Sequence, residues 1–467
     1  MLITFRKTII ACFIIVPTLV LLFSFQKPEQ KGDGPIEIGT GRIDITPEYP
    51  VRLTGYGNRT NVYDSVEQKL WGKVLVLDQK GKQPMIWLTL DLVGFPVFFA
   101  DELFARLAPK IGLKDRAQLV ISATHTHNGP ETGVLLNIFG STLPPNQLAD
   151  VRIYRDNLLN KLEKLVVDAY KSKAAGKLSW AIGNATFAMN RRVLENGKWK
   201  DFGETPDGPV DNNLPVLRAT DLQGKTIALL LNYACHGTTL VPEHNFVHGD
   251  WMGAAQQMLE EKYPGANAMV ALGCAGDANP TPRGEFKHVS QHAVMIANEI
   301  SALMSANKFI ALNSIPVGKM KKVELTFLHV PDAKEFAAQS KLDAAPGLYA
   351  RNSLEILARG GSISNTMSYP IYVWSFGNQL AIVFLGGEVV VDYSLRIKRE
   401  FSKNKMWVNA YSNDVSTYIA SKRLFAEGGY EVDGSMPYYN HPSRLTEDTE
   451  ERVMKTIHEL MPKEFLK

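Results

Sequence analysis

From Ile36 onward, short apolar runs of strand length alternate with longer segments whose apolar residues recur at helical spacing. The predicted strands are residues 74–77, 85–90, 118–122, 216–218 and 227–233, and the predicted helices are residues 101–111, 146–173, 251–262, 289–305 and 447–460. A chain in which strands and helices alternate buries both in packed layers. The pattern therefore predicts a mixed α/β or α+β layered domain of the kind that enzymes use.

The composition agrees with a folded enzyme and argues against a nucleic-acid partner. Of the 467 residues, 45% are hydrophobic and 21% are charged, which is close to the average of globular proteins. The net charge of +3 is too small for a protein that neutralises a row of phosphates. No internal repeat or low-complexity linker follows residue 35, and residues 316–331 form the weakest boundary in the pattern. We therefore expect one large catalytic domain over residues 31–467.

The N-terminal 30 residues have the composition of a targeting segment. Arg6 and Lys7 precede residues 8–25, which contain 18 residues without a charge. Pro17 lies in the middle of this run, and no small-residue cleavage site follows it. Residues 1–30 are therefore assigned as either a signal peptide or a membrane anchor. Either alternative predicts an exported protein that is periplasmic, secreted, or anchored in the membrane and facing outward.

Histidines follow two of the predicted strands directly. His125 and His127 are separated by one residue after the strand at 118–122, and His236 follows the strand at 227–233. Rigidly held imidazoles at strand ends suit zinc, because its ligands need a fixed tautomer and orientation. One His-x-His pair is weak evidence for a metal, since structural roles are common. A second strand that ends in histidine strengthens the prediction of a metal site.

A carboxylate and a glycine-rich turn add further candidates. Glu388 interrupts an apolar run after Gly386 and Gly387, where an unpaired carboxylate is costly to bury unless a metal or a basic group lies nearby. The alternative is an exposed glutamate on an edge strand. The glycine-rich turn near residues 273–284 holds Cys274, Asp277 and Asn279, and such turns allow close approach to a ligand.

Several motifs in order resemble the neutral ceramidase family, whose members are amidases that split the N-acyl bond of ceramide. The opening GTGRIDITPEYPVRLTGYG, the motif THTHNGP, the motifs MNRR, HGDWMG and GGE, and a tyrosine-bearing C-terminal stretch follow one another as in the family. They are spread over residues 36–440. The resemblance implies the catalytic N-terminal fold of that family, a zinc cofactor, and a lipid-like or other acylated small-molecule substrate.

The resemblance also implies roles for individual residues in the cleavage of an amide bond by a metal-activated water. The zinc ligands would be two histidines, a glutamate and a tyrosine, since such a site leaves room for a water or a polarised carbonyl. Other polar groups would shuttle a proton, contact the scissile amide and its developing oxyanion, or position the site. The implied ligands are His125, His236, Glu388 and Tyr418, and the implied catalytic groups are His127, Arg191, Tyr430, Asp277 and Asn279.

The chain departs from the family at one catalytic position. The family carries serine in a G-D-x-S-P motif, whereas this chain has Asn279 in the sequence Gly-Asp-Ala-Asn-Pro. An amide side chain cannot form an acyl-enzyme, so the alignment excludes covalent serine catalysis and leaves direct attack by water. The sequence also ends near residue 467, so the family's C-terminal immunoglobulin-like domain is not expected. Both departures bear on whether ceramide is the substrate.

Three alternatives to a ceramidase remain at this point. A metallohydrolase of the same fold could act on another N-acylated or a carbohydrate-derived compound. A lipid- or glycan-binding protein could keep the fold without catalysis, although it would have no reason to retain all the implied ligands. A hydrolase with Cys235 or Cys274 as nucleophile is the third alternative, and the same two thiols could instead form a disulfide.

Overall fold

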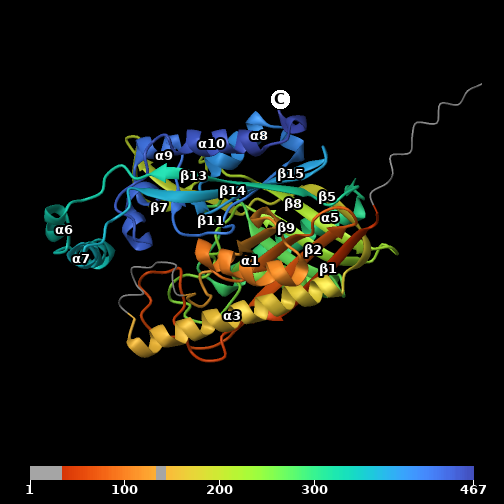
Figure 1. The fold of residues 1–467 in the computed structure, drawn as a ribbon, viewed down its shortest axis with the longest axis horizontal. Helices are drawn as coiled ribbons and strands as arrows, with labels where there is room; N and C mark the ends of the chain where they lie inside the picture. The colour runs from red at the N-terminus through yellow and green to blue at the C-terminus, as the bar shows by residue number, and fades with distance from the viewer. Residues whose placement is uncertain (1–33, 133–142) are drawn as a thin grey trace, which may run out of the picture. The chain divides into compact units, whose positions relative to one another are not determined.

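The predicted strands lie side by side in one large sheet in the computed structural model, which describes residues 34–132 and 143–467 (Figure 1). Nine of the described strands pair in this sheet, in the order β10-β9-β8-β5-β1-β2-β3-β4, with β12 beside β5. Their bounds are β1 Ile36–Asp44, β2 Trp71–Gln79, β3 Met85–Leu90, β4 Leu119–Ala123, β5 Ala174–Asn184, β8 Asn213–Asp221, β9 Thr226–Tyr233, β10 Asn267–Leu272 and β12 Ile310–Leu312. The pairs β3–β4 and β9–β10 are parallel, whereas the other neighbours are antiparallel.

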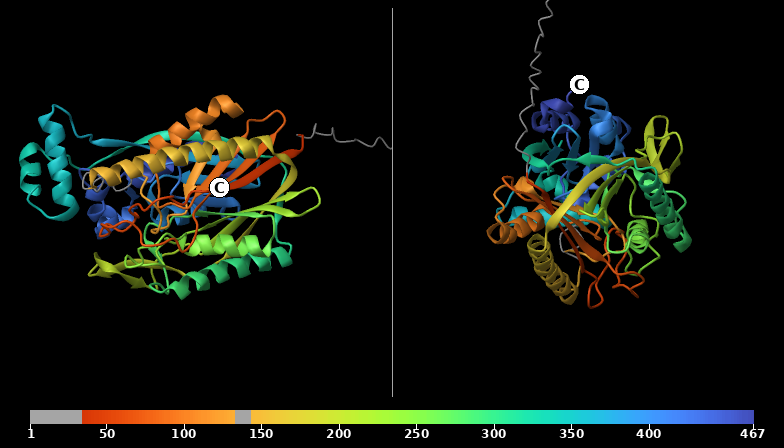
Figure 2. Two further views of the ribbon diagram at one scale, coloured as in Figure 1. Left: turned by 90° about the horizontal axis from the view of Figure 1, so that it is seen from below. Right: turned by 90° about the vertical axis from the view of Figure 1, so that its right-hand side faces the viewer.

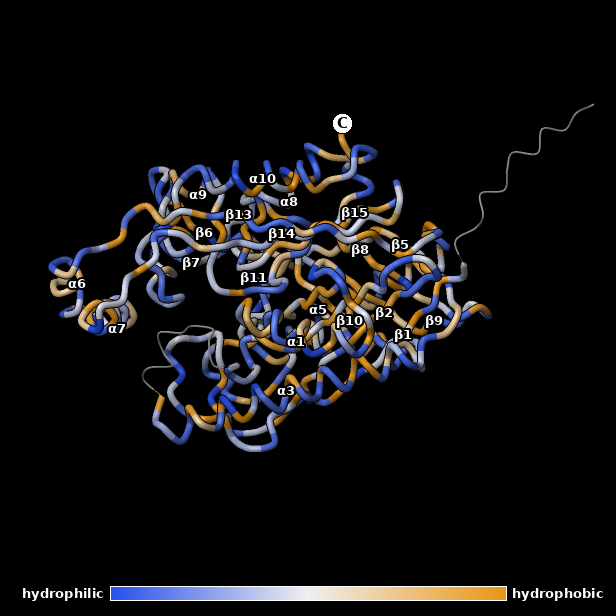
Figure 3. Tube along the Cα trace, viewed as in Figure 1, coloured by the Kyte–Doolittle hydropathy of each residue, from blue (hydrophilic) through white to orange (hydrophobic). Residues whose placement is uncertain are grey.

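Alternate residues of each strand point to opposite faces of this sheet, and helices cover one of these faces. Val74 and Val76 of β2 belong to a core cluster that includes Leu162, whereas Leu75 and Leu77 belong to a separate cluster on the other face. Figure 2 shows two helix pairs along the sheet, and Figure 3 shows apolar stripes on the helices and along the central strands. The pairs are α1 Val97–Ile111 with α3 Pro145–Lys171, and α4 Asp250–Lys262 with α5 Phe286–Ser305.

A second sheet packs on the other face of the large sheet. Its strands are β13 Val317–Thr326, β14 Thr366–Phe376, β15 Leu380–Leu385 and β17 Met406–Asn409. Trp87 of β3 contacts Trp374, Phe384 and Trp407 of this second sheet, with ring centroids 4.7 to 5.9 Å apart. Large aromatic side chains of this kind bury much apolar area and fix the two sheets against each other.

Further helices and two small sheets complete the domain. α10 Thr449–Leu460 packs on β13 and β14, whereas α6 Ala333–Gln339 and α7 Ala344–Ala358 pack on each other around a small apolar cluster of their own. The other α-helices and strands of the described residues are α8 Val391–Glu400, α9 Lys422–Glu427, the sheet of β11 Ala278–Pro280, β6 Ala188–Glu195 and β7 Lys198–Thr205, and the pair β16 Glu388–Val389 with β18 Tyr418–Ile419.

The predicted layered α/β class is confirmed, with one correction. Each predicted strand and helix overlaps an observed element, and the usual difference is one to four residues at an end. The predicted weak boundary at 316–331 is wrong, because Val317–Thr326 is a strand that pairs along its whole length with Thr366–Phe376. The residues after Gly34 form one compact unit.

The predicted targeting segment at residues 1–30 lies outside the described residues. Within residues 34–132 and 143–467, no helix combines the length and apolarity needed to cross a bilayer.

Candidate functional site

Strands near the two edges of the large sheet bring the predicted histidines together. His125 follows β4, and His236 follows β9, the neighbour of the other edge strand β10. The segment after β17 joins the two edges, because Ala410 N donates to Leu272 O at 3.0 Å and Ala123 N donates to Tyr411 O at 3.0 Å. The imidazole centroids of His125 and His236 therefore lie only 4.7 Å apart.

A short parallel ladder places Glu388 beside Tyr418. These residues are direct partners in the pairing of β16 with β18, and Glu388 N donates to Thr417 O at 2.9 Å. Gly387 turns the chain with φ of 74°, and a Cβ there would lie 2.5 Å from Thr417 O. The ladder begins after β15 has ended, so Glu388 does not interrupt a strand. Its side chain is 3% exposed, and the alternative of an exposed edge glutamate is wrong.

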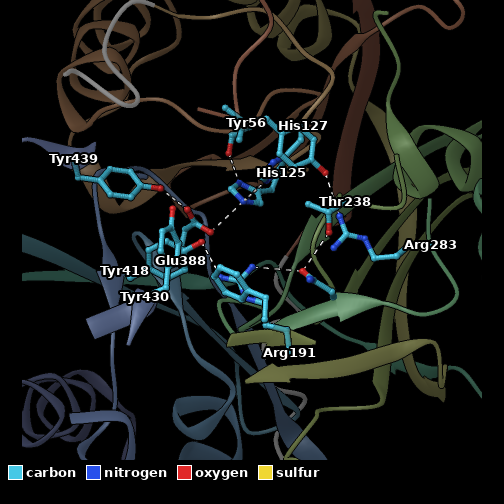
Figure 4. Close-up of a pocket in the computed structure, with 14 residues that line it drawn as sticks. Tyr56, His125, His127, Arg191, Thr238, Arg283, Glu388, Tyr418, Tyr430 and Tyr439 are labelled. Atoms are coloured by element: carbon cyan, nitrogen blue, oxygen red, sulfur yellow. Dashed lines mark hydrogen bonds and ion pairs between the residues drawn. The ribbon is translucent and has the colours of Figure 1, made fainter. Parts of the chain in front are cut away.

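Ring nitrogens and a carboxylate oxygen converge at the bottom of the site (Figure 4). Glu388 Oε2 lies 3.2 Å from His125 Nε2 and 3.0 Å from His236 Nε2, and His127 Nε2 lies 3.2 Å from His125 Nε2. Both His125 and His236 place Nδ1 on a backbone carbonyl, at 2.5 Å from Val93 O and 2.6 Å from Ala275 O. Donation through Nδ1 leaves the Nε2 lone pairs facing Glu388 Oε2.

This donor set fits a metal ion. Three imidazoles, those of His125, His127 and His236, offer ligand atoms within 4.8 Å of one another. The Oε2 atom of Glu388 is buried and accepts no hydrogen bond, so a cation bound among these lone pairs would compensate them. Burial, followed by the charge of Arg191, lowers the pKa of His236 to about 4, which keeps this imidazole neutral at pH 7.

The predicted Arg191 and Asn279 lie in the wall of the same pocket. Arg191 in β6 donates from Nη2 to Tyr418 Oη at 3.1 Å and from Nη1 to Asn279 Oδ1 at 3.4 Å, and its Nε binds Glu431 at 2.9 Å. The pocket has a volume of about 280 Å³. It is lined by Gly55, Tyr56, Val93, His125, His127, Arg191, Phe202, Thr238, Asn279, Arg283, Glu388, Tyr418, Tyr430 and Tyr439.

Tyr430 presents a hydroxyl to this pocket. Its ring packs against Tyr418 at 5.6 Å and Phe202 at 5.2 Å between centroids. In the described part of the chain, its hydroxyl makes no hydrogen bond. Burial, followed by the charge of Glu388, raises the pKa of Tyr430, so the phenol keeps its proton at neutral pH. Tyr430 is therefore able to donate a hydrogen bond to a ligand.

Asp277, in contrast, does not line the pocket. Its side chain is fully buried behind Arg191 and accepts hydrogen bonds from Asn190 Nδ2 at 3.0 Å and from Val391 N at 2.8 Å. Burial raises its pKa to about 6. The contacts join β6 to the start of α8, so the structure gives Asp277 a positioning role behind the site.

The sequence did not single out four polar residues that line the pocket. Tyr439 donates to Glu388 Oε1, which leaves Oε2 for the histidines, and Tyr56 stacks on His127 with centroids 4.7 Å apart. Thr238 donates to Asn279 Oδ1 at 3.2 Å, and Arg283 lies beside Tyr56. Of these, only Thr238 had a usable signal, since it follows His236 in the same turn.

The two body cysteines are free thiols outside the pocket lining. Cys235 and Cys274 are both completely buried and unpaired. Burial raises the pKa of each thiol well above its usual range, which disfavours the nucleophilic thiolate. Neither the disulfide nor the cysteine-nucleophile alternative agrees with this arrangement.

A buried carboxyl group beside the Glu388 turn yields a testable pH dependence. Burial raises the pKa of Asp414 to about 7, against a hydrogen bond from Ser416 that lowers it. The folded protein thus binds this proton more tightly than the unfolded chain, and stability is lost as pH rises from about 4 through 7, by up to ~1.4 kcal/mol per pH unit. Asp414→Asn should gain stability relative to the wild type between pH 5 and pH 8, measured as thermal midpoints. If the thermal midpoints of Asp414→Asn and the wild type differed by the same amount at pH 5 and at pH 8, the raised pKa of Asp414 would be contradicted.

Comparison with known proteins places this chain in a family. Residues 36–310, more than half of the chain, match the sequence profile described as "Neutral/alkaline non-lysosomal ceramidase, N-terminal". The chain belongs to the neutral/alkaline non-lysosomal ceramidase family. The predicted resemblance is confirmed, and the histidines at the ends of β4 and β9 lie within the matched residues.

Curated relatives in the ceramidase family extend the match at low identity. Neutral ceramidase B of Dictyostelium discoideum is 24% identical over 307 residues, which cover 60% of this chain and 42% of the relative. The neutral ceramidase of Pseudomonas aeruginosa is 23% identical over 255 residues, which cover 54% of this chain and 37% of the relative. The chain thus spans less than half the length of these two relatives.

Solved ceramidase structures share the fold over most of the chain. A structure described as "Ceramidase complexed with C2" matches with a TM-score of 0.68 at 17% identity, over 92% of this chain and 76% of that chain. The crystal structure of the neutral ceramidase from Pseudomonas aeruginosa matches with a TM-score of 0.66 at 18% identity over the same shares. These matches establish the ceramidase fold for this chain.

Proposed function

We propose that this protein is a zinc-dependent amidase that hydrolyses the N-acyl bond of ceramide or of a related acylated compound. One observation carries the proposal: in a chain of the ceramidase family, the imidazoles of His125, His127 and His236 cluster beside Glu388, whose buried Oε2 accepts no hydrogen bond. A purely binding protein would gain nothing from this costly cluster. The names of the relatives support an amide of a lipid as the substrate.

His125, His236, Glu388 and Tyr418 are the residues that would hold zinc. His127 is assigned to proton transfer because its Nδ1 has no hydrogen-bond partner, whereas His125 and His236 each anchor Nδ1 on a carbonyl. A zinc ion bound there would supply a Lewis acid and lower the pKa of water, which is the chemistry that amide hydrolysis needs.

The remaining polar groups act on the amide itself. Water adds its oxygen to the carbonyl carbon, the C–N bond breaks with its electron pair on nitrogen, and both protons of the water end on nitrogen, which leaves a carboxylate and a protonated amine. Burial, followed by the neighbouring histidines, lowers the pKa of His127 well below its usual range, so its imidazole is uncharged at pH 7, and we assign it to the transfer of a proton from water to the nitrogen. Tyr430 and Arg191 line the pocket and would donate hydrogen bonds to the carbonyl oxygen, where negative charge develops.

Asn279 supports direct attack by water. Its Oδ1 accepts hydrogen bonds from Arg191 and Thr238, which turns the amide nitrogen Nδ2 toward the remaining space. An amide nitrogen is a donor and not a nucleophile, so Asn279 assists by orientation and forms no covalent intermediate.

We also propose that the protein is exported. The support is the uncharged run of residues 8–25 after Arg6 and Lys7. This proposal leaves the signal peptide and the membrane anchor as alternatives.

Hydrolysis of a fluorescent short-chain ceramide by the full chain tests the function. We expect fatty acid release that a chelator lowers by about 100-fold or more and that zinc restores, because the metal supplies the Lewis acid. Magnesium should not restore activity, since an imidazole-rich site suits zinc and an oxygen-rich site suits magnesium. Undiminished turnover by the metal-free protein would overturn the metal dependence, and no turnover by a folded, zinc-loaded protein would exclude ceramide.

A further inference from the structure

An arginine without a carboxylate partner lies in the wall of the pocket. Arg283 lies near the end of the glycine-rich turn at residues 273–284, and Figure 4 shows its guanidinium beside Thr238. Its Nη2 lies 3.4 Å from Tyr56 Oη, and its buried Nε has no hydrogen-bond partner. Across residues 34–132 and 143–467, no carboxylate lies within ion-pair distance of this group.

Two other arginines near the pocket, Arg191 and Arg59, have ion-pair or hydrogen-bond partners within the protein. Arg191 pairs with the buried Glu431 at 2.9 Å. Arg59 donates to the backbone carbonyls of His127 and His244 and stacks on Tyr56. Among the residues that line the pocket, no free carboxylate therefore faces Arg283, since Glu388, the one carboxylate among them, is committed to the histidines.

We propose that Arg283 binds an anionic group of the substrate, so that the favoured substrate is an N-acylated compound with a carboxylate or phosphate close to the scissile amide. The inference rests on the proposed amide hydrolysis. A guanidinium binds both anions through paired hydrogen bonds, and an unpaired one in a partly buried wall is poised for such a ligand. Ceramide carries no charge and would leave Arg283 unmatched.

The position of Arg283 limits where the anion lies on the substrate. A single side chain, Tyr56, separates it from the site, because the Tyr56 ring contacts the His127 ring while its hydroxyl contacts Arg283. The anion is therefore a few bonds from the amide. An N-acyl amino acid meets this condition, since its carboxylate is on the carbon next to the amide nitrogen. The phosphate of an N-acyl phosphoethanolamine lies slightly farther away.

Matched substrate pairs test the proposal and separate the two anions. For the zinc-loaded full chain, kcat/KM is compared between N-hexanoylglycine and the neutral N-hexanoylglycinamide, and between N-hexanoyl phosphoethanolamine and N-hexanoyl ethanolamine. We expect the wild type to favour at least one anionic partner by about tenfold or more. In Arg283→Gln the ratio of kcat/KM for the anionic compound to kcat/KM for its neutral partner should fall toward one, whereas Arg283→Lys should keep part of this preference. Arg359→Gln, which changes an exposed arginine paired with Glu355, should leave the ratio unchanged.

Binding without turnover separates this inference from the proposed function. Calorimetry on the chelator-treated protein should show tighter binding of N-hexanoylglycine or N-hexanoyl phosphoethanolamine than of the matched neutral compound, with the difference lost in Arg283→Gln. Anion-dependent binding with no hydrolysis of any amide would support the role of Arg283 and overturn the amidase. Hydrolysis with a ratio near one in the wild type, or a ratio that Arg283→Gln leaves unchanged, would overturn the role of Arg283 alone.

Discussion

Replacing His236 with alanine should remove both bound metal and hydrolytic activity. The His236 ring is completely buried, and its Nε2 lies 3.0 Å from Glu388 Oε2 while its Nδ1 is fixed by Ala275 O. Loss of a partner that only orients a ligand costs about 10- to 100-fold in metal affinity or activity, so loss of the ligand itself should exceed about 100-fold. Metal content per chain after dialysis and kcat/KM for the same amide measure the two effects.

A histidine outside the pocket provides the control for this change. His329 is exposed and pairs with Glu335, so His329→Ala should retain full metal content and activity. Circular dichroism should show that His236→Ala is folded, because the change removes a single side chain and leaves the rest of the packed core in place. If the folded variant kept one metal per chain, His236 would not be a ligand, and His127 would be the next residue to change.

Most of the fold could be predicted because the spacing of apolar residues along the sequence distinguishes the strands from the helices. The apolar run Met85–Leu90 and the helical spacing of Pro145–Lys171 need no knowledge of the rest of the chain. The strand Val317–Thr326 was missed because its burial pattern is mostly exposed or intermediate, so it lacks an apolar signal. Its pairing with Thr366–Phe376, which begins some forty residues later in the chain, depends on the tertiary structure.

The metal site could be predicted only in part. The position of His125 and His236 after strands was a local signal, but their meeting depends on residues 410–412, which join β4 to β10. The contact of Tyr439 with Glu388 has no local signal, since tyrosine is common in cores. Arg283 looks like any loop arginine in the sequence, and only the absence of a nearby carboxylate in the described structure makes it informative.

Replacing Glu431 with glutamine should destabilise the protein more than other single charge removals near the site. Glu431 is fully buried and binds two arginines, Arg191 through Oε1 at 2.9 Å and Arg192 through Oε2. Breaking a buried ion pair on one side leaves uncompensated charge, and typical costs are about 3–5 kcal/mol. Thermal or denaturant unfolding of the metal-free protein measures this loss without a contribution from metal binding.

The same change should also lower activity where the variant is folded, because Glu431 fixes the guanidinium that reaches Tyr418 and Asn279. Glu427→Gln is the matched control: Glu427 also binds Arg192, at 3.0 Å, but Arg192 keeps Glu431 in that variant, and Arg191 is not touched. We expect Glu427→Gln to cost less stability and to leave kcat/KM near the wild-type value. Equal losses in the two variants would mean that Arg191 takes its position from the fold as a whole and that its pairing with Glu431 is dispensable.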